Sequence, residues 1–145
     1  MSSVRRQTHV AAPLEVVWDL VGDPNRHPEW FPKVVQAKCE GIEEGCSYRM
    51  VLKGPMGSTI DETALIESLE DCGEIKIRCE SGTYMLFKLL AAREGTFVDV
   101  EFGMEPAALQ FAVFDRLAGR RFYGRWLEQS VDALREAAEK APAAT

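Results

Sequence analysis

The chain of 145 residues carries 17 basic and 23 acidic side chains, which gives a formal net charge of −6. Hydrophobic residues make up 46% and charged residues 28%, the balance of a globular domain rather than of a disordered, collagen-like or coiled-coil chain. The acidic balance argues against nucleic acid as a partner, because nucleic acid binds cationic surfaces. We expect a single domain over residues 1–145, with residues 141–145 as a disordered tail.

Membrane insertion is not expected either. No apolar run approaches the roughly 20 residues that span a bilayer. The first residues also lack the apolar stretch of a signal peptide. We therefore expect a cytoplasmic protein without stable membrane insertion, and the sequence leaves its oligomeric state open.

The first third of the chain predicts a strand and two short helices. Residues Val4–Val10 alternate weakly, which indicates a strand. Pro13 suits the first turn of a helix. Apolar side chains then recur at helical spacing, at Leu14, Val17, Trp18 and Val21. Residues Asn25–Phe31 predict a second short helical turn.

From Val34 onward the hydrophobic period changes to two, which is typical of strands. Six strands are predicted, at Val34–Glu40, Ser47–Lys53, Ser58–Leu69, Glu74–Glu80, Thr83–Ala92 and Thr96–Met104. Short connections rich in glycine separate them. Short connections predict antiparallel pairing, because parallel neighbours need longer crossovers.

The register of one hairpin can be predicted from its charges. With Glu94-Gly95 as a two-residue turn, Phe87 faces Phe102 and Lys88 faces Glu101. This register puts apolar pairs on one face and opposite charges on the other, as a half-buried sheet requires.

The last third is predicted to be helical. Residues Arg120–Ala141 form one amphipathic helix, about 33 Å long at 1.5 Å per residue. A seven-stranded sheet is about 29 Å wide, so this helix is long enough to cross it. Residues 107–118 are out of phase with the helix, which predicts a break at Gly119. Whether 107–118 form a short helix, a flap or a mobile lid is left open.

Local sequence motifs resemble those of one known superfamily. The run from Ala12-Pro13 to the pair Val17-Trp18 resembles its opening strand and helix. Asp23-Pro24 followed by Glu29-Trp30-Phe31-Pro32 resembles its second helix, and Glu94-Gly95-Thr96 resembles its penultimate hairpin. Over residues 4–140 the chain resembles the START-like or SRPBCC superfamily, which includes polyketide cyclases/dehydrases and lipid-transfer proteins.

The resemblance implies an α+β helix-grip fold. A curved seven-stranded antiparallel sheet would wrap around the long C-terminal helix, with two short helices after strand 1 and a cavity between sheet and helix. The implied function is a binding or carrier protein for a small hydrophobic ligand (lipid, polyketide or quinone-like), without a cofactor. One alternative is a polyketide cyclase/aromatase-type enzyme acting in the same cavity, so catalysis stays open. A protein-interaction module without a ligand is the second alternative, because the motifs are mainly structural.

Two polar residues are candidates for the chemistry of such a cavity. Glu62 shares a strand face with Ile60, Ala64 and Ile66, which predicts that it points inward. A buried carboxylate needs a partner and can orient a ligand or move a proton. Glu62 and Tyr48 are thus weak catalytic candidates, and a hydrated position of Glu62 at the rim is the alternative.

The predicted ligand-binding side chains are aromatic, methionine and these polar groups. Flexible methionines suit an adaptable pocket. The set is Trp30, Phe31, Tyr48, Met50, Glu62, Met85, Phe87, Phe102, Phe114, Tyr123 and Trp126.

Histidine, cysteine and arginine give weaker signals. His9 and His27 are expected on the surface, and no spacing indicates a metal site. The cysteines (Cys39, Cys46, Cys72 and Cys79) are interpreted as reduced, mostly structural thiols. The arginines Arg116, Arg120, Arg121 and Arg125 indicate either a solvated helix face or a site for acidic ligands.

Overall fold

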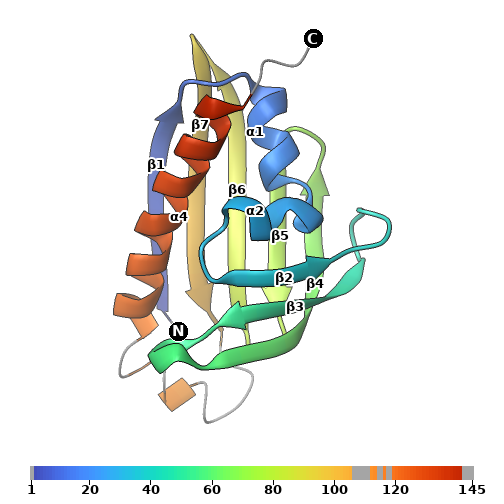
Figure 1. The fold of residues 1–145 in the computed structure, drawn as a ribbon, viewed down its shortest axis with the longest axis vertical. Coiled ribbons are helices and arrows are strands. Elements are labelled where there is room, and N and C mark those ends of the chain that lie inside the picture. Colours follow the sequence, from blue (N-terminus) through green and yellow to red (C-terminus); the bar gives the residue numbers. More distant parts are fainter. Residues whose placement is uncertain (1, 106–111, 114–115, 117–118, 142–145) are drawn as a thin grey trace.

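The protein is described by a computed structural model over residues 2–105, 112–113, 116 and 119–141. Its seven antiparallel strands curve around a long C-terminal helix, with two short helices after the first strand (Figure 1). The predicted helix-grip architecture is confirmed. Most of the segment 107–118 and of the predicted tail 141–145 lies outside the described residues.

The sheet places the first strand next to the last. The strands are β1 (Ser2–Val10), β2 (Val34–Lys38), β3 (Ser47–Lys53), β4 (Thr59–Glu70), β5 (Glu74–Cys79), β6 (Thr83–Ala92) and β7 (Gly95–Met104). Their spatial order is β1-β7-β6-β5-β4-β3-β2. Strands β2 to β7 therefore follow one another as a meander, and β1 pairs along its whole length with β7.

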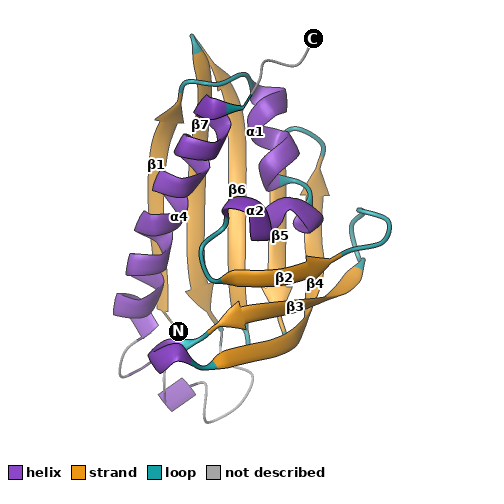
Figure 2. Cartoon of the chain, in the orientation of Figure 1, coloured by secondary structure: helices purple, strands orange, loops and turns teal. Residues whose placement is uncertain are grey.

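The helices gather on one face of this sheet, as Figure 2 shows. They are α1 (Leu14–Val21), the 3-10 turn η1 (Pro24–Arg26), α2 (His27–Trp30) and α4 (Arg120–Lys140), while a second 3-10 turn, η2 (Pro55–Gly57), joins β3 to β4. Helix α4 runs along β1 and β7 and contacts α1 and α2 beside it. The expectation that it crosses the whole sheet is wrong, because its axis follows the strands and α1 and α2 cover their neighbours.

The hairpin of β6 and β7 differs in register from the prediction. Ala92 faces Gly95, so Arg93 and Glu94 form the turn, and the pairing is shifted by two residues. A side-chain carbon on Gly95 would lie 2.2 Å from the carbonyl oxygen of Val10, so glycine is needed inside the strand, beside β1. Glu94 takes the left-handed conformation instead, with φ of 59°. An even shift keeps every side chain on its predicted face.

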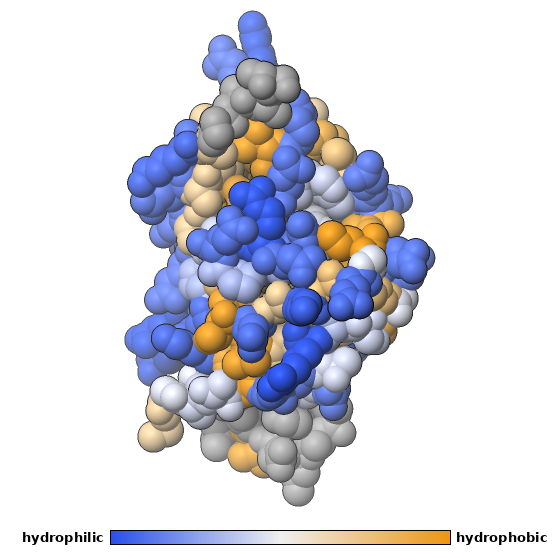
Figure 3. Space-filling model, turned by 45° about the vertical axis from the view of Figure 1, so that its right-hand side comes forward, coloured by the Kyte–Doolittle hydropathy of each residue, from blue (hydrophilic) through white to orange (hydrophobic). Residues whose placement is uncertain are grey.

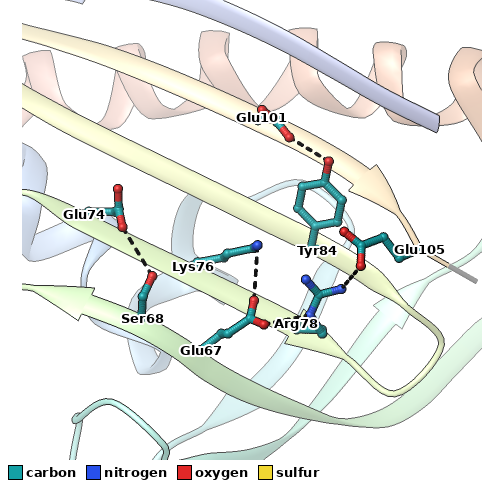
Figure 4. A network of polar contacts seen from close by, with 8 residues as sticks. All are labelled: Glu67, Ser68, Glu74, Lys76, Arg78, Tyr84, Glu101 and Glu105. Atoms are coloured by element: carbon teal, nitrogen blue, oxygen red, sulfur yellow. Dashed lines mark hydrogen bonds and ion pairs between the residues drawn. The ribbon is translucent and has the colours of Figure 1, made fainter. Parts of the chain in front are cut away.

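The outer face of the sheet carries a network of charges (Figure 4). Lys76 and Arg78 of β5 lie 3.3 and 3.2 Å from the carboxylate of Glu67. Next to them the Tyr84 hydroxyl donates to Glu101 across 2.6 Å. These contacts link neighbouring strands on the hydrophilic outer face, while the opposite face of the same strands is buried.

A few large apolar side chains are exposed on the surface of the described residues. The face in Figure 3 is mostly hydrophilic, with separate apolar patches. The exposed large apolar residues are Val35, Ile42, Met56, Leu90, Phe97 and Val113. Leu90 and Phe97 face each other across β6 and β7 and form a small apolar pair on the outer face. Exposed residues of this kind are normal in monomeric proteins and do not by themselves mark an interaction surface.

Candidate functional site

Aromatic rings fill one half of the space between sheet and helices. Phe31 lies at their centre, with its ring centroid 4.9 Å from that of Trp30 and 5.3 Å from that of Trp126. Phe87 and Phe102 complete the cluster at 5.7 and 5.6 Å from Phe31. Rings at these separations are in direct contact. This half, which we call the aromatic half, is therefore closed by its own side chains.

The end of helix α1 positions the aromatic half. Its last carbonyl groups have no partner inside the helix and need external donors. The indole N–H of Trp30 donates to Leu20 across 2.9 Å, and the imidazole Nε2 of His27 lies 2.8 Å from the oxygen of Val21. These bonds fix α2 against α1, and Phe31 follows directly.

His27 corrects a sequence prediction. It was expected on the surface, but it is fully buried, whereas His9 is exposed on the edge strand as predicted. Since a carbonyl only accepts, Nε2 must carry the proton, and the buried Nδ1 has no hydrogen-bond partner among the described residues. Burial lowers the pKa of His27 to about 4.

A chain of polar side chains crosses the other half of the interior. Glu62 is buried and points inward, as predicted. One carboxylate oxygen accepts from the backbone N–H of Ser81 at 2.9 Å, and the other lies 3.3 Å from the Ser81 hydroxyl. That hydroxyl lies 3.2 Å from the hydroxyl of Thr83, which is 2.7 Å from the phenol oxygen of Tyr123. The chain thus connects β4 to helix α4.

Tyr48 adds a buried polar group without a partner. Only 5% of the residue is exposed, and its hydroxyl has no hydrogen bond within the described part of the protein. Tyr48 faces Ala64, two residues along β4 from Glu62. Burial raises the pKa of Tyr48, so at neutral pH its phenol keeps a proton to donate. A buried hydroxyl without a partner costs about 1–3 kcal/mol, which a ligand that accepts its hydrogen bond would recover.

Methionines surround the polar chain on the inner face. Met50 faces Glu62 across β3 and β4, Met104 faces Thr83 across β7 and β6, and Met85 lies two residues further along β6. All three side chains are buried. Unbranched thioether side chains fill irregular spaces and rearrange readily. We call these residues, together with the polar chain and Tyr48, the polar half.

Sequence reasoning missed Ser81 and Thr83. The pair Ser81-Gly82 was interpreted only as a turn signal. The spacing along β6 could have revealed Thr83. Residues two apart in a strand share a face, so an inward Met85 implies an inward Thr83.

The remaining predicted residues are Phe114 and the four arginines. Phe114 is outside the described residues. The four arginines are exposed, and Glu128 of α4 forms an ion pair with Arg6 of β1. Exposure is compatible with both predicted alternatives, so the choice between a solvated face and a site for acidic ligands stays a prediction.

A groove of about 600 Å³ lies outside the interior, beside α1. It is lined by Trp18, Asp19, Gly22, Asp23, Arg26, Ile42, Leu69 and Asp71. The indole of Trp18 lies so close to Gly22 that a side-chain carbon there would be 2.4 Å from it. No motif or spacing in the sequence predicted this groove.

Within residues 2–105 and the described parts of 112–141, three or more His, Cys, Asp or Glu side chains nowhere converge on a possible metal position. In the same part of the chain, no helix combines the length and apolar character that crossing a membrane requires.

The fold and this interior define a helix-grip protein, and comparison with known proteins agrees. The chain belongs to the family described as "Polyketide cyclase / dehydrase and lipid transport", whose model matches residues 1–139. The predicted START-like relationship is confirmed. A search of curated proteins gives no significant match.

Solved structures of similar fold come from several bacteria. A START superfamily protein from Mycobacterium smegmatis has a TM-score of 0.75 at 15% identity, covering 95% of this chain and 97% of its own. An AHSA1-like protein from Aeromonas hydrophila has a TM-score of 0.70 at 14% identity, covering 95% and 92%. A Staphylococcus aureus protein of unknown function, SA2116, has a TM-score of 0.70 at 14% identity, covering 95% and 93%. At these identities the likeness establishes the fold alone.

Proposed function

We propose that this protein binds a small hydrophobic ligand with one polar group, and that the ligand occupies the polar half of the interior. Membership of a family described by lipid transport and polyketide chemistry supports the ligand class. The observation that carries the proposal is the buried Tyr48 hydroxyl, which has no partner among the described residues. Tyr48 lies two residues before Met50 on β3, and both side chains are buried on the face that carries Glu62.

The roles of the polar groups follow from their contacts. Tyr48 donates a hydrogen bond to a carbonyl or hydroxyl oxygen of the ligand. Glu62 already receives two contacts from Ser81, so it orients the polar chain that includes Thr83 and Tyr123. The apolar body of the ligand packs against Met50 and Met85. The binding role requires no covalent step.

The cyclase alternative assigns Glu62 a different role. A cyclase needs a group that exchanges protons with the bound chain. The carboxylate oxygens of Glu62 both face Ser81, an arrangement that favours positioning over proton transfer. The two functions differ in one result: Glu62→Gln would abolish turnover in a cyclase while leaving ligand affinity nearly unchanged.

Binding is tested first without assuming a ligand. Protein purified from its host is examined by native mass spectrometry, and a retained small molecule is the expected result. Calorimetric titration with 2-naphthol and with naphthalene then separates the polar contact from the apolar one. We expect tighter binding of 2-naphthol, because only its hydroxyl oxygen can accept from Tyr48.

Two tyrosine variants test whether Tyr48 causes the tighter binding of 2-naphthol. Tyr48→Phe should reduce 2-naphthol affinity about tenfold, the value of one net hydrogen bond, and leave naphthalene binding unchanged. Tyr84→Phe is the matched control, since its hydroxyl bonds to Glu101 on the outer face. Absence of both a retained ligand and probe binding contradicts the proposal, and so does an unchanged preference for 2-naphthol in Tyr48→Phe.

A further inference from the structure

Two cysteines meet at the base of the loop between β2 and β3. Cys39 follows β2 and Cys46 precedes β3, with residues 40–45 between them. Their sulfur atoms lie 3.7 Å apart, and both are free thiols. Cys39 is buried and Cys46 is half-buried, so a small solute reaches Cys46 first.

The backbone holds both cysteines in place. The N–H of Cys39 donates to the side-chain oxygen of Asn25 at 2.7 Å, and its carbonyl accepts from the Asn25 amide at 2.9 Å. The N–H of Cys46 donates to the carbonyl of Glu43 at 3.1 Å. The sulfur atoms therefore stay neighbours because of the fold and do not meet by chance.

We propose that Cys39 and Cys46 form a redox modification site, in which a hydroperoxide converts the two thiols into an intrachain disulfide. The proposal is independent of the ligand proposed above. A disulfide bond is about 2.05 Å long, so the sulfur atoms must approach by less than 2 Å from their present separation.

The chemistry takes two balanced steps. The Cys46 thiolate attacks the peroxide, takes one oxygen and becomes a sulfenic acid, while the other oxygen leaves as water or an alcohol. The Cys39 sulfur then attacks the Cys46 sulfur, and hydroxide leaves with the Cys39 proton as water. Burial raises the pKa of Cys39 to about 12, so this thiol enters the second step protonated and gives up its proton as its sulfur attacks. Two thiols and one hydroperoxide thus yield one disulfide, one water and one further water or alcohol.

The disulfide would act on the groove beside α1. Ile42 lies in the loop that the bond closes, and it lines the groove. Asp23 also lines the groove, and its carboxylate accepts a hydrogen bond from the N–H of Asn25 at 2.9 Å. Asn25 is the residue whose side chain bonds to the backbone of Cys39. Oxidation therefore ties the two ends of the loop at one wall of the groove, and we expect slower amide hydrogen exchange at residues 40–45.

The other two cysteines serve as controls. Cys79 is buried on the inner face of β5, and Cys72 lies half-buried in the turn between β4 and β5. Among the described residues, neither sulfur atom contacts another cysteine as Cys39 and Cys46 do, so Cys72→Ser and Cys79→Ser should leave the oxidation of Cys39 and Cys46 unchanged.

Tryptic peptides make the test specific. Cleavage after Lys38 and Arg49 leaves Cys39 and Cys46 in one peptide, whereas Cys72 and Cys79 fall in two others. The full chain is treated with hydrogen peroxide, its remaining thiols are alkylated, and the peptides are weighed. We expect the 39–49 peptide to lose two hydrogen atoms and escape alkylation, with full recovery after dithiothreitol. Thiols counted after unfolding should fall from four to two.

Several outcomes would overturn the proposal. One is a 39–49 peptide that stays doubly alkylated while Cys72 is oxidised. Another is disulfides that join this peptide to Cys72, to Cys79 or to a second chain. The third is equal rates of disulfide formation in the folded and the guanidinium-unfolded chain, because the fold would then contribute nothing. Cys46→Ser should prevent the bond, and the wild-type result stands even if that variant fails to fold.

Discussion

The two halves of the interior are built from the same strands but are packed in opposite ways. Strand β6 supplies Thr83 to the polar half and Phe87 to the aromatic half, four residues apart on one face. In the aromatic half each large ring contacts others directly. In the polar half, hydroxyl groups and a carboxylate hold one another among methionines, and Tyr48 is left without a partner among the described residues.

The difference shows how one small domain can combine a stable core with a region suited to ligand binding. Close ring packing supplies stability, because a buried aromatic side chain removes a large apolar area from water. Polar groups bonded in a buried chain contribute less net stability, but they define a direction and a binding chemistry. Substitutions in the two halves should accordingly affect different measurements.

The largest expected effect is the loss of the central ring. Phe31→Ala leaves a cavity among four aromatic side chains and should lower the free energy of unfolding by about 3–5 kcal/mol, measured by urea denaturation. The control is Phe97→Ala, whose ring is half exposed on the outer face. If both variants lose the same stability, the aromatic half is not the structural centre of the domain.

The next effect is the dependence of stability on pH. The pKa of His27 in the folded state is lowered to about 4 from 6.5, so the unfolded chain binds more protons between these values. Above pH 6.5 the protonation of His27 therefore does not change the free energy of unfolding. The free energy of unfolding decreases as the pH falls from 6.5 toward 4, by roughly 3 kcal/mol over the whole interval.

Two histidine variants isolate this contribution, because the chain has only two histidines. His27→Gln should flatten the dependence between pH 4 and 6.5, whereas His9→Gln should retain it. Urea denaturation at several pH values is the measurement. A slope that persists in His27→Gln would assign the effect to other groups.

A smaller effect is expected from breaking the polar chain. Thr83→Val keeps the shape of the side chain but removes the hydroxyl between Ser81 and Tyr123, at a cost of about 1–2 kcal/mol. Adding Tyr123→Phe to this variant should cost less than Tyr123→Phe costs in the wild-type protein, since the bond between the two residues is already lost. Strictly additive losses in the double variant would show that Thr83 and Tyr123 are not coupled.

The smallest effect belongs to the outer face. Lys76→Met removes an ion pair with Glu67 near the surface and should change the free energy of unfolding by less than about 1 kcal/mol. The same pairing lowers the pKa of Glu67 against the opposing effect of burial, so the variant should raise it, which carboxyl NMR can follow. A loss comparable to that of Phe31→Ala would mean that the outer network, too, is a structural centre.

Hydrophobic period and turn residues were sufficient to predict the elements of this fold. The alternation along β4 also predicted the inward position of Glu62, because a strand side chain has only two possible faces. The predicted hairpin register was wrong because position 95 must be glycine to fit beside Val10. Val10 belongs to β1, which is far from the hairpin in the sequence but pairs with β7 in the sheet. Pairing charges within the hairpin alone could not reveal that contact.

Tertiary contacts explain the error at His27 and the proximity of Cys39 and Cys46, which the sequence did not predict. Beside a proline in a short turn His27 resembles a surface residue, and only the packing of α2 on α1 brings it to the carbonyl of Val21. Cys39 and Cys46 are seven residues apart, a spacing that indicates nothing until the loop reverses the chain and brings the sulfur atoms together.

The central claim, that ligands bind in the polar half, is tested most directly by amide NMR during titration with 2-naphthol. We expect the largest shifts in three segments that line this half, residues 48–52, 60–64 and 81–85, with smaller shifts at Phe31 and Phe87. Shifts confined to the groove residues around Trp18 and Leu69, or centred on the aromatic half, would contradict it.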